Sequence, residues 1–278
     1  MPLADRTEPV TGQRIALGGT AANIARCAAR GNVRVGLLSR VGTDFPKPLE
    51  QTLRREGIDL RGFQHVAKKA SPTCWIIQPR SDSQRTLIDQ GAMEDVANVP
   101  VPVSVVRSSD WIHLATGDPE YQLRVARLAR SAGKRVAADP GQEVHYRWDG
   151  PSLRRLLEAS EILFGNRSEI LHVVRSVREG SPRDLLARVP LIVRTEGSSG
   201  VTAWTRSGVI HHKSARSRRS ESLVGAGDAF RGGFYSAWFA GKPLAACLAR
   251  GQSFARGWID RGGGPWKRSR PSVEERES

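Results

Sequence analysis

The stretch that decides the fold reads LVGAGDAFRGGF over residues 223–234, near the carboxyl end of a chain of 278 residues. Two glycines flank one alanine, an acidic residue follows at once, and a run compatible with a helix begins there. Small residues let backbone N–H groups converge on an anion, and the positive end of the helix dipole favours that anion. Asp228 then places a carboxylate beside the anion site. A base next to an oxyanion cradle is what phosphoryl transfer to an alcohol requires.

Taken alone, the same residues could equally form a turn that caps an ordinary helix. They are not a dinucleotide-binding fingerprint, because the third glycine of G-x-G-x-x-G would fall at Phe230. The chain also contains no G-x-x-x-x-G-K-[ST] sequence, so no P-loop is predicted. The rest of the chain must therefore distinguish a phosphoryl-transfer site from a simple cap.

Length and composition predict a single α/β domain over residues 1–266 and a charged, frayed tail over residues 267–278. Because the chain has no run of 18 apolar residues, no membrane span is expected. The three cysteines, Cys27, Cys74 and Cys247, are far apart and lack metal-ligand spacing. They indicate reduced thiols and a cytoplasmic protein.

The formal net charge of +15 suggests nucleic-acid binding as one alternative. The one dense basic cluster contains Lys213, Arg216, Arg218 and Arg219, without the interleaved aromatic residues that stack on bases. An anionic small molecule such as a nucleotide would also be attracted by a positive field. We therefore expect a small-molecule substrate and no nucleic acid.

Strand-like and helix-like segments alternate along most of the chain. The expected strands cover residues 33–38, 73–78, 85–89, 111–114, 135–138, 161–164 and 191–194. The expected helices cover residues 20–30, 47–56, 118–132, 226–240 and 243–258. This order predicts an α/β fold with a doubly wound, mostly parallel sheet flanked by helices, in which ligands gather beyond the carboxyl ends of the strands. The polar strand pair predicts a small β-flap lid, built from about residues 10–17 and 62–90.

On these residues the chain resembles the ribokinase-like (PfkB) carbohydrate kinases, and within them the nucleoside kinase branch, which includes adenosine kinases. The resemblance covers residues 18–266. Its early signature is GGTAANIA at residues 18–25, and its late signature is residues 225–233. Between them, GDPE at 117–120 and DPGQ at 139–142 are more similar to nucleoside kinases than to sugar kinases.

The resemblance implies an ATP- and Mg²⁺-dependent kinase that phosphorylates the 5′-hydroxyl of a ribonucleoside, with a homodimer as one form of assembly. Asp228 would take the proton from that hydroxyl. The N–H groups of Gly225, Ala226 and Gly227 would form the anion hole. The implied binding positions are Gly18, Gly19 and Asn23 for the ribose, Asn166 and Glu169 for Mg²⁺, and Thr195, Gly197 and Gly200 for ATP.

Three features leave alternatives open. Asn166 and Glu169 have the spacing of a helix capping box, which is compatible with the metal role. Only 17 residues precede Gly18, so the family's first strand and its substrate-binding Asp are expected to be missing. Residues 222–224 read SLV where the family has Asp-Thr-x, so the family's monovalent-cation site is not carried over. The alternatives are a kinase for a free sugar such as ribose or fructose, and a family member with weak or no activity.

Overall fold

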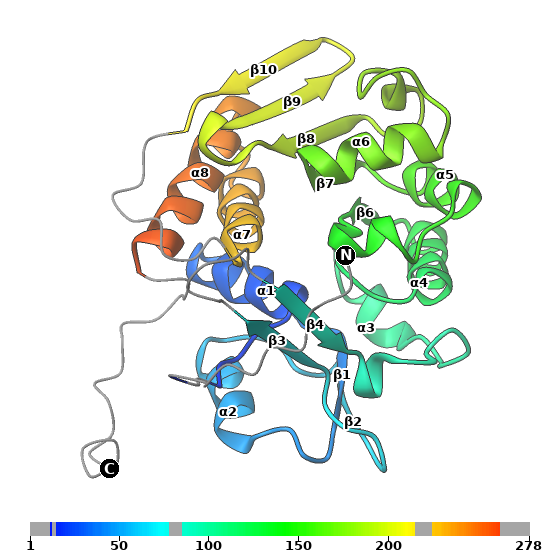
Figure 1. Cartoon of the computed structure of the whole chain (residues 1–278), viewed down its shortest axis with the longest axis vertical. Helices are drawn as coiled ribbons and strands as arrows, with labels where there is room; N and C mark the ends of the chain where they lie inside the picture. Colours follow the sequence, from blue (N-terminus) through cyan, green and yellow to red (C-terminus); the bar gives the residue numbers. More distant parts are fainter. Residues whose placement is uncertain (1–11, 13–14, 78–84, 215–223, 262–278) are drawn as a thin grey trace, which may run out of the picture.

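The computed structural model describes residue 12 and residues 15–77, 85–214 and 224–261. Its centre is a six-stranded sheet with the spatial order β10-β9-β8-β7-β6-β5 (Figure 1). The strands are β5 (Trp111–Leu114), β6 (Arg135–Ala138), β7 (Ile162–Asn166), β8 (Leu191–Thr195), β9 (Val201–Thr205) and β10 (Gly208–His212). Strands β5 to β8 are parallel, and β9 and β10 continue the sheet as antiparallel strands. The predicted mostly parallel sheet is confirmed, while the β9–β10 hairpin is an addition to it.

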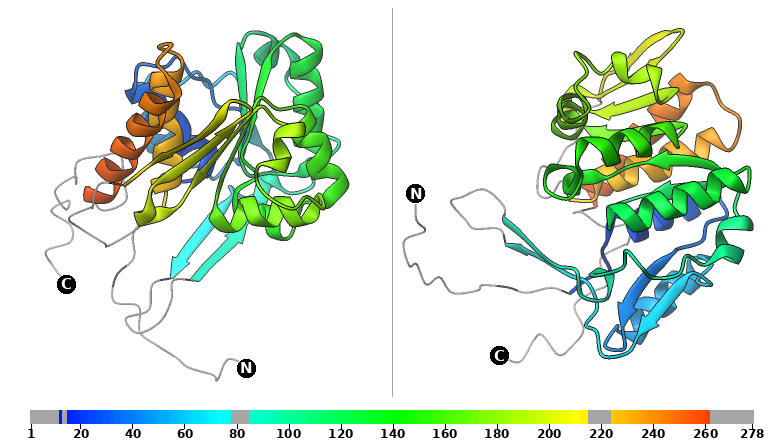
Figure 2. Two further views of the ribbon diagram at one scale, coloured as in Figure 1. Left: turned by 90° about the horizontal axis from the view of Figure 1, so that it is seen from above. Right: turned by 90° about the vertical axis from the view of Figure 1, so that its right-hand side faces the viewer.

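Helices cover both faces of this sheet, as the doubly wound prediction requires. Figure 2 shows the sheet edge-on between two helical layers. One layer contains α4 (Pro119–Ser131), α5 (Gly150–Glu158) and α6 (Arg167–Ser176), which connect successive parallel strands. The other layer contains α1 (Thr20–Arg30), α7 (Ala226–Trp238) and α8 (Leu244–Asp260). A short helix, α3 (Val103–Arg107), precedes β5.

The core is divided by the sheet into two apolar clusters. Within β7, Leu163 packs toward α4, α5 and α6, whereas Phe164 packs toward α7 and α8. Within β8, Ile192 and Val193 divide in the same way. Successive side chains of a strand point to opposite faces, so a strand that is covered on both sides must be apolar throughout. This explains why the central strands read as continuous apolar runs in the sequence.

Helices α1 and α7 lie close together because small residues line their contact. A Cβ added to Gly232 would lie 2.3 Å from the Cβ of Cys27, and one added to Gly31 would lie 2.3 Å from the Cβ of Ser236. A larger side chain at either glycine would force the two helices apart. The close packing matters for function, because it brings the start of α1 beside the start of α7.

A smaller unit packs beside α1. In it, β1 (Ser39–Gly42) pairs in parallel with β2 (Phe63–Val66), and α2 (Lys47–Arg55) packs nearby. A strand was predicted over residues 33–38, but regular strand pairing begins only at Ser39. Within 33–38 the structure has an isolated β-bridge from Gly36 to Asp59. The alternation in 33–38 reflects packing, since Leu37 lies in the apolar cluster with α1 and α2.

The antiparallel pair β3 (Thr73–Ile77) and β4 (Arg85–Asp89) confirms two predicted strands. Figure 2 shows this hairpin standing off from the rest of the molecule. Residues 15–17, predicted to join the flap, are not in a strand. Most of 10–14, the turn over 79–84 and the tail over 267–278 lie outside the described residues. So do most of the residues before Gly18, where the family's first strand was expected to be missing. In the described part of the chain, β5 has a strand neighbour on one side only, and no helix is long and apolar enough to cross a membrane.

Candidate active site

The amino end of α7 is shaped to receive an anion. Gly225 precedes the helix in the left-handed conformation with φ 79°, which favours glycine. A Cβ there would also strike the ring of Trp258, at 2.6 Å. The Trp258 indole Nε1 donates a hydrogen bond to the carbonyl of Val224 (2.8 Å). Helix α8 therefore fixes the residue that leads into Gly225 and α7. The first N–H groups of a helix have no partner within it, and the helix dipole adds positive charge there.

Asp228 lies in this first turn and is held by a residue from α1. The Asn23 amide nitrogen donates a hydrogen bond to Asp228 Oδ2 at 2.9 Å, although 205 residues separate the two. The Asp228 side chain is half-buried. Burial raises the pKa of its carboxyl to about 6, and the Asn23 hydrogen bond and the Arg231 charge limit that rise. A carboxylate with a pKa near neutrality is suited to accept a proton at physiological pH.

Of the three positions predicted at the start of α1, Asn23 contacts Asp228, and its backbone N–H donates to the Gly19 carbonyl at 2.9 Å. Gly19 precedes α1 with φ 91°, and both Gly18 and Gly19 are exposed, with open space around their α-carbons. Asn23 is only 8% exposed. Its Oδ1 is buried and accepts no hydrogen bond in the described part of the chain. Asn23 therefore presents an unused acceptor next to the carboxylate that it positions.

Asn166 and Glu169 form the capping box that their spacing predicts. Glu169 N donates to Asn166 Oδ1 (3.0 Å), and Asn166 N donates to Glu169 Oε2 (2.7 Å). Burial raises the pKa of Glu169. Its second oxygen, Oε1, accepts no hydrogen bond from a described residue, and the Asn166 side chain is exposed. The described residues contain no group of three His, Cys, Asp or Glu side chains that could hold a metal ion. A cation here would have to keep several waters, as Mg²⁺ does.

A cleft of about 230 Å³ opens where β7 and β8 end. Its lining residues are Asn166, Arg167, Ser168, Thr195, Glu196, Gly197 and Ser199. Asn166 therefore meets the predicted ATP positions Thr195 and Gly197, as expected from its pairing with Thr195 across the two strands, whereas Glu169 does not line the cleft. Gly200 does not line the cleft. It has φ 113°, and a Cβ there would lie 2.2 Å from the carbonyl oxygen of His212, so it shapes the loop.

A buried ionic network below the site was not predicted from the sequence. Arg231 makes a two-point hydrogen bond with Asp139 at the end of β6, through its Nε and Nη2 atoms, the latter at 2.6 Å. Burial alone would raise the pKa of Asp139, but the Arg231 charge and His113 hold it below its usual value. His113 on β5 lies between Tyr235 OH (2.7 Å) and Asp139 Oδ2 (3.3 Å). The sequence places Asp139 directly after a predicted strand, but this position does not indicate that Arg231 is its partner.

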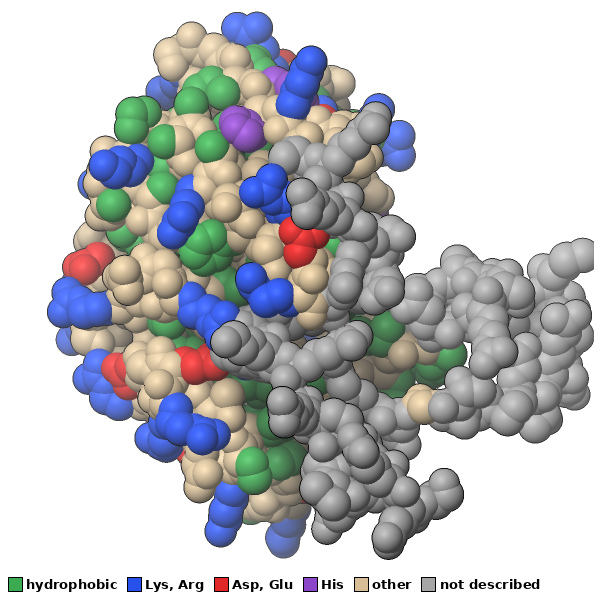
Figure 3. Space-filling view, turned by 90° about the vertical axis from the view of Figure 1, so that its left-hand side faces the viewer, with side chains coloured by type: hydrophobic (Ala, Val, Ile, Leu, Met, Phe, Trp, Pro, Cys, Tyr) green, Lys and Arg blue, Asp and Glu red, His purple; other side chains and the backbone are tan. Residues whose placement is uncertain are grey.

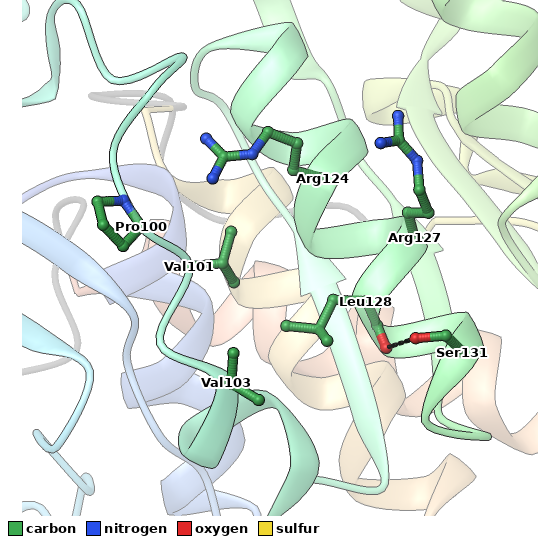
Figure 4. Close-up of a pocket in the computed structure, with 7 residues that line it drawn as sticks. All are labelled: Pro100, Val101, Val103, Arg124, Arg127, Leu128 and Ser131. Carbon is green, nitrogen blue, oxygen red and sulfur yellow. Dashed lines mark hydrogen bonds between the residues drawn. The ribbon is translucent and has the colours of Figure 1, made fainter.

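The remaining surface features lie apart from this site. A larger cavity of about 540 Å³ lies on the outer side of α4 (Figure 4). It is lined by Pro100, Val101, Val103, Arg124, Arg127, Leu128 and Ser131, none of which was predicted to bind a ligand. On the face shown in Figure 3, Lys and Arg side chains are scattered among polar and apolar ones.

Comparison with known proteins identifies the family. A family profile described as pfkB family carbohydrate kinase matches residues 4–264. The chain belongs to the pfkB family. Among pfkB relatives, the nucleoside kinase of Methanothermobacter thermautotrophicus is 32% identical over 238 residues, covering 83% of this chain and 74% of that protein. The cytidine kinase of Thermococcus kodakarensis is 30% identical over 253 residues, covering 88% of each. The crystal structure of Methanocaldococcus jannaschii nucleoside kinase superimposes with a TM-score of 0.82 at 27% identity, covering 98% of this chain and 90% of that one.

Proposed function

We propose that this chain is an ATP-dependent kinase that transfers a phosphoryl group to the 5′-hydroxyl of a ribonucleoside. The observation that carries the proposal is the Asp228 carboxylate at the amino end of α7, held there by Asn23. Relatives named nucleoside kinase and cytidine kinase, at 32% and 30% identity, support a nucleoside as the acceptor.

In the proposed reaction, Asp228 accepts the proton of the 5′-hydroxyl. The hydroxyl oxygen forms a bond to the γ-phosphorus of ATP while the bond from that phosphorus to the ADP oxygen breaks, and ADP leaves. The N–H groups of Gly225, Ala226 and Gly227 stabilise the charge on the transferred group. Removing a positioned general base of this kind usually slows a reaction by about 10² to 10⁴.

Substrate positioning falls to the start of α1. The unpaired Oδ1 of Asn23 is an acceptor for a ribose hydroxyl, and the same side chain holds Asp228 through its amide nitrogen. Gly18 and Gly19 leave room for the sugar to approach the backbone. A ring hydroxyl bound at Asn23 would therefore lie close to the base that deprotonates the 5′-hydroxyl.

The nucleotide side of the site is the cleft at the ends of β7 and β8. Thr195 and Gly197 line it, and Gly200 fixes the turn of its loop. Mg²⁺ fits the donor set, because the free Oε1 of Glu169 and the exposed amide of Asn166 are oxygen ligands with room for water. When bound, the ion would neutralise charge on the phosphates of ATP.

The test is a panel of acceptors with ATP: adenosine, inosine, cytidine, ribose and fructose. We expect ³¹P NMR to detect a 5′-monophosphate from at least one nucleoside and no product from the free sugars. Asp228→Asn, purified identically, controls for contaminating kinases. Phosphorylation of ribose or fructose in preference to every nucleoside would establish the sugar-kinase alternative instead, and ATP binding without transfer would indicate an inactive member.

We also propose that two copies associate through the β3–β4 hairpin. Its large apolar residues Trp75, Ile76, Ile77, Leu87 and Ile88 are all exposed. Trp75 and Leu87 are directly opposite each other on one face, so Ile76 and Ile88 lie on the other face. A lid over a substrate needs only one apolar face, and a second copy would cover the other.

Sedimentation equilibrium tests this association. The wild type should have twice the chain mass. One of the two double variants, Trp75→Ser/Leu87→Ser or Ile76→Ser/Ile88→Ser, should have the monomer mass, depending on which face is shared. A monomeric wild type would contradict the proposal.

A reducing compartment, the cytoplasm, is the proposed location. All three cysteines are free, and Cys27 and Cys247 are buried in the core, whereas Cys74 is exposed on the flap. Free thiols at these positions are typical of reducing conditions.

A further inference from the structure

Arg231 is a charged side chain fixed from two sides inside the protein. It is 6% exposed. Asp139 accepts hydrogen bonds from its Nε and Nη2 atoms, and its guanidinium carbon lies 5.7 Å from the centre of the Phe164 ring. Bidentate pairing with a carboxylate fixes the plane of a guanidinium as well as its position. The side chain therefore has one orientation.

That orientation directs the remaining nitrogen, Nη1, toward the anion-binding turn. A Cβ on Gly227 would lie 2.8 Å from Nη1, so Arg231 occupies the space beside this glycine. Helical side chains lean toward the amino end of their helix and cover the residue four positions earlier, as here. Nη1 makes no hydrogen bond to any residue in the described ranges. Its charge is close enough to interact with both Asp228 and Glu169.

Apart from Arg231, the charged groups around Asp228 disfavour the ionised form of its carboxyl. The groups that face it are Asn23 and Cys27 from α1, Asp139 from the end of β6, Glu169 from α6 and Arg231 from α7 itself. Of these described groups Arg231 alone is a cation, and the phosphates of ATP would add further negative charge. Desolvating an arginine is costly, and a pair needed only for packing could be replaced by apolar residues.

We propose that Arg231, oriented by Asp139, is a positioning residue for phosphoryl transfer, which keeps Asp228 ionised and the first turn of α7 in place against neighbouring negative charge. This inference rests on the proposed function. It assigns no contact with the substrate to Arg231, which acts through Asp228 and Gly227. It also explains why Asp139 binds Nε and Nη2, on the side of the guanidinium away from Gly227. The positive charge of Arg231 then lies between Asp139 and the first turn of α7, which carries Asp228.

The test is the pH dependence of kcat/KM for the nucleoside in two variants expected to change it in opposite directions. Arg231→Met/Asp139→Asn removes both charges without leaving a buried carboxylate unpaired. Loss of the Arg231 cation raises the pKa of Asp228, and loss of the Asp139 anion lowers it by a smaller amount. The acid limb should therefore move up by about half a pH unit, which is a loss of about threefold near pH 5.5 relative to the loss near pH 8.5. Asp139→Asn alone removes only the anion, so its acid limb should move to lower pH.

General damage to the fold would not give opposite shifts, which makes the comparison decisive. Arg188→Met is the matched control, since Arg188 pairs with Glu158 and Glu179 ahead of β8, at the opposite end of the strands from the site. Its profile should match the wild type. Acid limbs that coincide in all variants, or that move the same way in both test variants or in the control, would overturn the inference. A wild type that transfers no phosphate to any nucleoside would instead refute the proposed function.

Discussion

Replacing Asp228 by Asn should remove activity and stabilise the protein at the same time. The amide has the shape of the carboxylate, and its oxygen can still accept the hydrogen bond from Asn23. It cannot accept the proton of the substrate hydroxyl, so we expect kcat to fall by at least about 100-fold. The gain in stability is the more unusual expectation, and its size follows from the pKa of the carboxyl.

Burial raises the pKa of Asp228 from 3.8 to about 6. Each unit corresponds to about 1.4 kcal/mol, so a shift of about 2 units corresponds to about 3 kcal/mol. Because the side chain is partly exposed, screening by solvent reduces the expected value to about 1–3 kcal/mol. The sign follows from the raised pKa: the folded protein prefers the protonated acid. The cost is therefore absent below about pH 4, grows as pH rises to about 6, and is constant above that.

Urea unfolding followed by tryptophan fluorescence measures this difference. At about pH 8, Asp228→Asn should unfold with a free energy about 1–3 kcal/mol above that of the wild type, and near pH 4 the two midpoints should converge. Asp110→Asn is the control, because Asp110 is exposed and should change little at either pH. An Asn variant that is no more stable than the wild type at pH 8, or whose advantage persists unchanged at pH 4, would refute the reasoning.

Three further substitutions probe how the site is held. Asn23→Ala removes the donor to Asp228, so the acid limb of the kcat/KM profile should move to higher pH; an unmoved limb would show that this hydrogen bond does not tune the base. Gly225→Ala must adopt φ 79° against the Trp258 ring and should cost about 1–3 kcal/mol in urea unfolding together with most of the activity, whereas full stability would contradict the observed approach. Trp258→Phe loses the hydrogen bond to Val224 and should cost about 1 kcal/mol while raising KM for ATP, with an unchanged KM counting against a role for α8 at the site.

Local sequence signals predicted the elements that build the site. Helix α1 ends where a glycine follows a run of helix formers, and α4 begins at Asp118 and Pro119, whose cap the structure shows. The box formed by Asn166 and Glu169 is likewise a matter of four consecutive residues. Each of these depends on chemistry within one helical turn, which a sequence displays directly.

The partners across the site could not be predicted in the same way. Asn23 and Asp228 are 205 residues apart, and Arg231 and Asp139 are 92 apart. The contact of Asn23 with Asp228 depends on how closely α1 packs on α7. The contact of Arg231 with Asp139 depends on which strand of the sheet lies under α7. Both are properties of the whole fold. Gly31 and Gly232 carry a trace of this packing, since the close approach of α1 to α7 requires a glycine at each.

One buried polar atom at the start of α1 supports the proposed position of the ribose. A buried acceptor without a partner costs about 1–3 kcal/mol, so a ligand that donates a hydrogen bond to it gains binding energy. Asn23 Oδ1 is such an atom, and it lies on the same amide that holds Asp228. Asp228 itself is less stable ionised in the protein than in water. In the proposed complex, a ring hydroxyl of the ribose that donates to Asn23 and the 5′-hydroxyl that shares its proton with Asp228 would relieve both costs at once. Binding energy is then greatest for an acceptor that carries hydroxyls at both positions, so a 5′-deoxynucleoside should bind more weakly than its parent nucleoside.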